Sequence, residues 1–279
     1  MVAFTEWYEG GYGVSFRVKR RLLEKRSKYQ KIEVYETEGF GKMLVIDGAI
    51  QFIEKWEKMY HEILVHPVML AHPNPENILI VGGGDGGALR EVLLHDTVKK
   101  ARVVEIDKDV VDIVRKYIPI DNGAFDNGKS ELIIDDGIRF VKRSKDKYDV
   151  IIVDSTDPKG PAEELFNVPF YRDCYNLLRE KGLIVTQSGG AYFDTKLSIK
   201  VVKNMKQVFD KVHPFFFSVI GYAPSWGFSV GVKGDIDFLK IDKERGNRVK
   251  TEYYDPEYHE RMLFLPRRLR ETIENLQGI

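Results

Sequence analysis

Cysteine is almost absent from the 279-residue sequence, which contains only Cys174. A single cysteine excludes an internal disulfide, and its apolar surroundings at 169–180 indicate a packed core thiol. The first ten residues include Glu6 and Glu9, where a signal peptide needs an uninterrupted apolar stretch. We therefore expect a cytoplasmic protein.

Long apolar runs and net charge are also missing. Stretches such as 43–53 are interrupted by Asp47 and Gly48, so none approaches the ~18 apolar residues of a membrane span. The 43 Lys and Arg balance the 43 Asp and Glu, which leaves no positive field for nucleic acid. Charged residues reach 31% against the usual ~25%, a weak sign of a thermophilic source.

Two patterns divide the chain near residue 55. From Gly13 to about Ile53 apolar and polar residues alternate between turn signals, which predicts a small antiparallel β unit. From Trp56 the apolar spacing becomes helical until prolines end it. We predict an N-terminal β-strand domain at 1–55 and a larger domain at 56–279. The basic run at 19–26 is expected to be a solvated β-edge or an oligomer contact.

After Pro75 continuous apolar strands alternate with helices. The expected strands lie at 77–82, 101–106, 131–134, 148–154, 182–190 and 217–222, and the expected helices at 87–95, 109–118, 169–180 and 197–209. This order predicts an α/β fold with a doubly wound, mostly parallel, Rossmann-like sheet. In such sheets ligands bind at the carboxyl ends of the strands.

A glycine-rich turn follows the first of these strands. Residues 82–87, GGGDGG, match G-x-G-x-x-G and open a helix, where a nucleotide is bound by backbone amides. Glu105 ends the next strand, where an acid accepts hydrogen bonds from ribose hydroxyls. A ligand-free turn explains the glycines but not the acid. A nicotinamide dehydrogenase and an S-adenosyl enzyme both remain open.

Acidic pairs end two further strands. Asp136 beside Asp135 is placed to accept from an adenine amino group, although solvated turn acids also explain Asp135. Asp154 and Asp157 lie three residues apart at the end of the strand at 148–154. Two carboxylates at the mouth of the sheet suit a polycationic substrate.

Six motifs in order carry a family resemblance. They are YHEIL at 60–64, IVGGGDGG at 80–87, VEID at 104–107, DDG at 135–137, DSTDPKGPAEELF at 154–166, and Gln187 after a strand. Together they resemble the spermidine synthase family of aminopropyltransferases over essentially the whole chain. The resemblance implies a sheet of the S-adenosylmethionine-methyltransferase type and a homodimer or homotetramer. It also implies transfer of an aminopropyl group from decarboxylated S-adenosylmethionine to a primary amine, with release of methylthioadenosine. The donor would be a co-substrate and not a permanently bound cofactor.

The resemblance also implies roles for individual residues. Asp154 would be the catalytic base. The amine would contact Tyr60, Asp157, Gln187 and Glu57, the last being the only acid in the segment WEKM before Tyr60. The donor would be held by Gln30, Gln51, His61, Gly83, Asp85, Glu105, Asp136, Gly137 and Pro161. The loop at 156–166 is expected to be a lid, with a rigid turn as the alternative.

Charge at Asp85 favours the decarboxylated donor. Ordinary S-adenosylmethionine would place its carboxylate near this acid and be repelled, whereas the decarboxylated form presents only an ammonium. A helix N-terminal acid stabilised by the dipole explains neither the position nor its companions. Asp154 acts as a base only if burial raises its pKa and lowers that of the amine.

The acceptor stays open, and so do two other functions. Where family members have a longer loop, this chain has the short segment GYAPSWGFSV at 221–230, so putrescine, cadaverine and agmatine all remain candidates. An S-adenosylmethionine-dependent amine N-methyltransferase and a non-catalytic polyamine or nucleoside sensor are the alternatives. We expect no metal, because His61 and His66 point about 140° apart on a helix.

Overall fold

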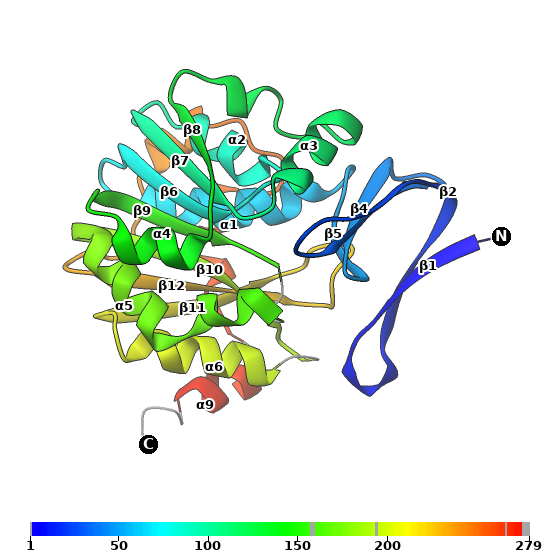
Figure 1. Ribbon diagram of the computed structural model, residues 1–279. Helices are drawn as coiled ribbons and strands as arrows, with labels where there is room; N and C mark the ends of the chain where they lie inside the picture. The colour runs from blue at the N-terminus through cyan, green and yellow to red at the C-terminus, as the bar shows by residue number, and fades with distance from the viewer. Residues whose placement is uncertain (1, 157–159, 193–194, 266, 275–279) are drawn as a thin grey trace.

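The fold was analysed in a computed structural model that describes residues 2–156, 160–192, 195–265 and 267–274. Two sheets organise this part of the chain (Figure 1). The N-terminal strands are β1 (Val2–Trp7), β2 (Gly13–Arg26), β3 (Lys31–Thr37), β4 (Lys42–Ile46) and β5 (Ala49–Ile53). They pair in sequence order, each antiparallel to the next. The predicted β unit is confirmed, and β1 extends it before Gly13.

The second sheet has the order β11-β12-β10-β9-β6-β7-β8. Its strands are β6 (Asn77–Gly82), β7 (Lys100–Glu105), β8 (Ser130–Ile134), β9 (Tyr148–Asp154), β10 (Leu178–Gly190), β11 (Lys211–Phe217) and β12 (Trp226–Lys233). Strands β8, β7, β6, β9 and β10 are parallel, and β12 runs antiparallel to both β10 and β11. The doubly wound, mostly parallel sheet is confirmed.

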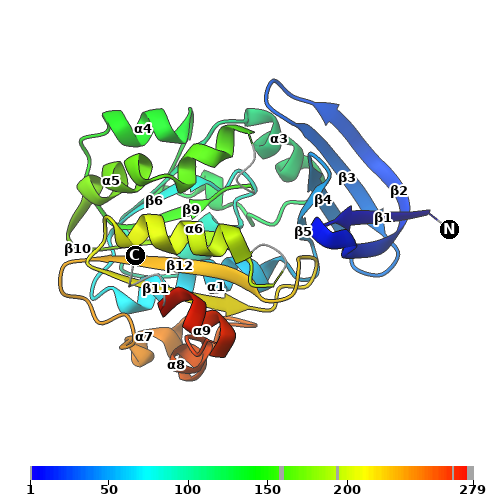
Figure 2. The ribbon, with the colours of Figure 1, turned by 90° about the horizontal axis from the view of Figure 1, so that it is seen from below.

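Helices cover both faces of this sheet (Figure 2). They are α1 (Glu57–Ala71), α2 (Gly87–Leu93), α3 (Lys108–Tyr117), α4 (Gly137–Arg143), α5 (Val168–Leu177), α6 (Thr195–Lys206), α7 (Lys243–Arg248), α8 (His259–Met262) and α9 (Arg267–Glu274), with 3-10 turns η1 (Glu9–Gly11), η2 (Ala124–Asp126), η3 (Gly160–Phe166) and η4 (Pro256–Tyr258). Ile78 and Ile80 of β6 pack on the side of α1 and α2, and Leu79 and Val81 pack on the side of α4, α5 and α6. This alternation explains why the strand is apolar throughout.

Three local expectations differ from the structure. The strand expected at 217–222 is wrong, because β11 ends at Phe217 and the next strand is β12. Strand β11 contains Pro214, which is tolerated there because β11 lies at the edge of the sheet. The helix α4, which is only seven residues long, was missed. The helix expected at 169–180 ends at Leu177, where β10 begins one residue later.

Helix α3 joins the N-terminal sheet to the larger sheet. Its apolar residues, Val110, Ile113 and Val114, share one cluster with side chains of β3, β4 and β5. Asp107, which caps α3, accepts hydrogen bonds from Ser27 and Gln30 after β2. The carboxyl ends of the parallel strands therefore face the N-terminal sheet. Among the described residues, no helix is long and apolar enough to cross a membrane.

Candidate active site

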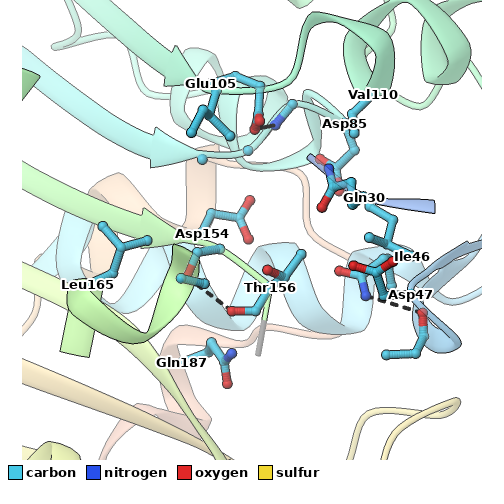
Figure 3. A pocket seen from close by; sticks show the side chains of 18 of the residues that line it. Gln30, Ile46, Asp47, Asp85, Glu105, Val110, Asp154, Thr156, Leu165 and Gln187 are labelled. Carbon is cyan, nitrogen blue, oxygen red and sulfur yellow. Dashed lines mark hydrogen bonds between the residues drawn. The ribbon is translucent and has the colours of Figure 1, made fainter. Parts of the chain in front are cut away.

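A cavity of about 210 Å³ lies at the carboxyl ends of β6, β7 and β9, beside the N-terminal sheet (Figure 3). The predicted site residues that line it are Gln30, Gln51, Tyr60, Gly83, Asp85, Glu105, Asp136, Gly137, Asp154 and Gln187. Asp157 lies outside the described residues. Pro161 falls in η3, and its side chain is not described. Glu57 and His61 do not line the cavity.

The glycine loop at 82–87 packs closely against the carboxyl ends of β7 and β9. Gly83 donates its backbone N–H to the carbonyl of Asp154 at 2.7 Å. Gly84 donates to Glu105 Oε2 at 3.1 Å, and a Cβ at Gly84 would lie 2.8 Å from the same oxygen. Only glycine therefore leaves room for the acid at this point. Asp107 donates its backbone N–H to Glu105 Oε1 at 2.8 Å, and burial raises the pKa of Glu105 to about 7.

Asp154 lies at the inner end of the cavity. The hydroxyl of Tyr60 donates to Asp154 Oδ1 at 3.0 Å, whereas Asp154 Oδ2 is buried without a hydrogen-bond partner among the described residues. Burial, with Asp85 nearby, raises the pKa of Asp154 to about 7. A carboxyl group with this pKa is matched to general base catalysis near neutral pH.

Asp85 is held from behind by His61. His61 Nε2 lies 3.4 Å from Asp85 Oδ2, and His61 Nδ1 lies 2.7 Å from Glu57 Oε2. Burial opposes a charged imidazole, but Asp85 and Glu57 outweigh it and raise the pKa of His61 well above its usual value. Asp85 also accepts from the backbone of Gly87 at 2.8 Å, at the start of α2.

The expected amine contact by Glu57 is not supported by the structure. Glu57 is 5% exposed, and Arg90 donates to its two oxygens at 2.8 and 2.9 Å. One of these oxygens also binds His61. Both carboxylate oxygens of Glu57 are therefore already paired, and Glu57 does not line the cavity.

The other predicted residues come from separate elements. Gln30 donates from its amide to Asp107 Oδ2 at 3.0 Å. Asp136 caps α4 by accepting from Ile138 at 2.8 Å. Gln187 accepts from the backbone of Gly189 at 3.1 Å and is 2% exposed. These contacts fix each side chain at the cavity wall before any ligand binds.

Comparisons with known proteins agree with this geometry. Residues 57–240 match the spermine/spermidine synthase domain, and residues 2–54 match the spermidine synthase tetramerisation domain. This chain belongs to the spermine/spermidine synthase family of polyamine aminopropyltransferases. The polyamine aminopropyltransferase of Thermococcus onnurineus (strain NA1) is 54% identical over 274 residues, covering 98% of this chain and 97% of that protein. That of Pyrococcus abyssi (strain GE5 / Orsay) is 51% identical over 277 residues, covering 97% and 99%.

Two solved structures of the family superpose on the whole chain. A spermidine synthase in complex with the transition state analogue AdoDATO has a TM-score of 0.94 at 34% identity, covering 98% of this chain and 95% of that one. The spermidine synthase of Thermotoga maritima has a TM-score of 0.93 at 33% identity, covering 99% and 95%.

The sequence did not reveal an aromatic wall of this family member's cavity. Tyr222 and Trp226 line the cavity together with Tyr8, and the ring centroids of Tyr60 and Tyr222 lie 5.7 Å apart. Those of Tyr222 and Trp226 lie 4.8 Å apart. From the sequence, the segment at 221–230 indicated only that a longer loop is missing. Its aromatic residues were the feature from which the aromatic wall could have been predicted.

The two acids and His61 lie close together. His61, Asp85 and Asp154 each offer one atom, and these atoms lie within 4.8 Å of one another. His66 is not part of the set, since it binds Glu91 and His95 at 3.0 Å. Oxygens so arranged attract any cation, including an ammonium group.

Proposed function

We propose that the protein moves the aminopropyl group of decarboxylated S-adenosylmethionine to a primary amine and releases methylthioadenosine. The acceptor would be putrescine, which gives spermidine, or cadaverine or agmatine. The observation that carries the proposal is the pairing of Asp85, inside the glycine loop, with Asp154 at the end of β9, because both carboxylates reach one cavity. Similarity to a spermidine synthase solved with a transition state analogue supports it.

The donor would lie along the glycine loop. Glu105 would accept from the ribose hydroxyls, Asp136 from the adenine amino group, and Gln30, Gln51, Gly83, Gly137 and Pro161 would complete this side. Asp85 would face the ammonium of the donor tail. A carboxylate at that point attracts the decarboxylated tail and repels the carboxylate of ordinary S-adenosylmethionine.

Asp154 would remove the proton that prevents attack. The amine nitrogen attacks the methylene carbon next to the sulfonium, the carbon–sulfur bond breaks, and its electron pair stays on sulfur. The proton released from the nitrogen passes to Asp154 Oδ2, the oxygen without a partner among the described residues. The leaving group needs no activation, so positioning and this proton transfer supply most of the catalysis.

The amine chain would run along the aromatic wall. Tyr60, Tyr222 and Trp226 offer apolar surface to methylenes and ring faces to a cation. Gln187 and Asp157 would add polar contacts. The loop at 156–166 would close over both substrates.

We also propose a boundary near residue 55 and a homotetramer assembled through the N-terminal sheet. The two family models, which match 2–54 and 57–240, support this division, and the first is a tetramerisation domain. Sedimentation of the full chain tests the assembly, and a monomer at micromolar concentration would contradict it.

A donor assay tests the reaction. Purified protein is incubated with putrescine, cadaverine or agmatine and with either donor, and products are identified by mass spectrometry. We expect aminopropylated amine and methylthioadenosine from the decarboxylated donor only. Methylated amine from ordinary S-adenosylmethionine would indicate the N-methyltransferase, and tight binding of methylthioadenosine without turnover would indicate a sensor.

A further inference from the structure

A buried ion pair lies directly behind the donor-tail acid. Arg90 of α2 and Glu57 of α1 form a two-bonded pair, with Nη1 to Oε1 at 2.8 Å and Nη2 to Oε2 at 2.9 Å. Arg90 is 8% exposed and Glu57 5%. Arg90 is itself anchored by the carbonyl of Ile120 at 2.6 Å and by Glu91. The reaction chemistry gives this pair no direct role.

The pair is joined to the cavity through one imidazole. Glu57 Oε2 lies 2.7 Å from His61 Nδ1, and His61 Nε2 lies 3.4 Å from Asp85 Oδ2. The backbone of Gly87 packs directly against the imidazole ring, and a Cβ at this position would lie only 2.3 Å from Cε1 of His61. The ring therefore has no room to move on this side. On another side the ring of Tyr60 stands edge-on at 5.2 Å. The chain Arg90, Glu57, His61, Asp85 is therefore continuous and fixed.

We infer that Glu57 and Arg90 are positioning residues that act through His61 to keep Asp85 and Asp154 ionised side by side. This inference rests on the proposed function. Oxygens of the two acids lie within 4.8 Å of each other in a partly buried site, where like charges favour one carboxyl group keeping its proton. A positive imidazole beside them reduces this conflict, and Asp85 and Glu57 together keep the imidazole protonated.

The surroundings of His61 agree with this assignment. The titratable or charged groups that face it are Glu57 and Tyr60 from its own helix, Asp85 from the glycine loop and Asp154 from β9, with Arg90 behind Glu57. An apolar pair of similar volume would pack as well as Arg90 and Glu57. The charges of Arg90 and Glu57 are therefore explained by their effect on the protonation of His61.

The variant Glu57→Gln tests the inference. It keeps the shape of the side chain but removes its charge, so the pKa of His61 falls and Asp154 keeps its proton to higher pH. We expect the acidic limb of the kcat/KM–pH profile for the amine to move up by about one unit. Activity below pH 6 should then fall about tenfold, whereas activity above pH 9 should stay close to that of the wild type.

Glu33→Gln is the matched control. Glu33 is a buried glutamate, 4% exposed, that pairs with Arg21 in the N-terminal sheet away from the cavity. Its profile should keep the wild-type midpoint. If Glu57→Gln leaves an unpaired Arg90 and does not fold, Glu57→Gln/Arg90→Met removes both charges and should show the same shift.

Two outcomes would overturn the inference. One is an unchanged midpoint with activity lowered equally at every pH, which is the effect of a structural residue. The other is an equal shift in Glu33→Gln. Failure of the proposed function is separate, because the wild type would then transfer no aminopropyl group. Histidine-ring NMR still decides the inference in that case, since the pKa of His61 should lie well above its usual value in the wild type and should be lower in Glu57→Gln.

Discussion

Tyr60 donates its hydroxyl proton to Asp154 Oδ1 across 3.0 Å, and this contact joins the first turns of α1 to the end of β9. The two residues are 94 positions apart in the sequence. The hydrogen bond holds one carboxylate oxygen and leaves Oδ2 facing no protein donor among the described residues. In the proposed mechanism, Oδ2 is therefore the oxygen that receives the proton.

Removal of this hydroxyl shifts the pH dependence of the reaction. In Tyr60→Phe the carboxylate loses a donor of about 0.5–1.5 kcal/mol, so the pKa of Asp154 rises further above its present value of about 7. The acidic limb of kcat/KM should move up by up to about one pH unit. A profile with the wild-type midpoint would show that the contact does not stabilise the ionised acid.

Asp154→Asn removes the proposed catalytic base. We expect kcat to fall by about 10²–10⁴, while methylthioadenosine binds as in the wild type. In the wild type Asp154 is protonated below about pH 7, so kcat/KM for the amine, measured at saturating donor, falls tenfold per unit there and is level above. The variant should lose this limb. Near-normal turnover would mean that Asp154 only positions the amine.

Sequence patterns predicted the sheet and most of this site because both depend on local signals. Asp85, Glu105 and Asp154 each end or follow an apolar strand, and parallel strands bring such ends together. The role of Glu57 could not be found this way. Its partner Arg90 lies on another helix, 33 positions away, and nothing in WEKM distinguishes an acid facing a ligand from one facing an arginine.

The proposed contact of Glu105 with the donor ribose predicts that donor binding depends on pH. Burial holds its pKa near 7, and ribose hydroxyls bind best to the ionised form. Below pH 7 a proton must be lost before binding, so the affinity for methylthioadenosine should weaken up to about tenfold per unit. Calorimetry between pH 5.5 and 8.5 measures the affinity for methylthioadenosine. The control is Glu105→Gln, which should bind methylthioadenosine weakly at every pH. A wild-type affinity independent of pH would contradict the assignment.

Asp85→Asn tests discrimination between the two donors. Loss of the carboxylate removes both the attraction for the decarboxylated tail and the repulsion of the ordinary one. We expect KM for the decarboxylated donor to rise. The ratio of the binding constants of the decarboxylated donor and of S-adenosylmethionine should fall by at least about tenfold. Unchanged discrimination would show that Asp85 does not contact the tail.

Acceptor breadth depends on the segment at 221–230. Tyr222 and Trp226 reach the cavity, and the backbone of Ala223 is tied to the Tyr8 hydroxyl at 3.2 Å. The segment is nevertheless short, and Glu57, which the family resemblance places against the amine, is paired with Arg90 instead. Less protein therefore covers the end of a long acceptor than a longer loop would.

A less enclosed pocket discriminates weakly, because each methylene changes binding by only ~1–3 kcal/mol even in a fitted one. The measurement is kcat/KM for putrescine, 1,3-diaminopropane, cadaverine, agmatine and spermidine. We expect at least two of these amines to be good acceptors. In Trp226→Ala the differences in kcat/KM among the amines should be smaller. A preference for putrescine of more than about a thousandfold over every other amine exceeds what one or two methylenes supply. That result would mean that a further element closes the pocket around the acceptor.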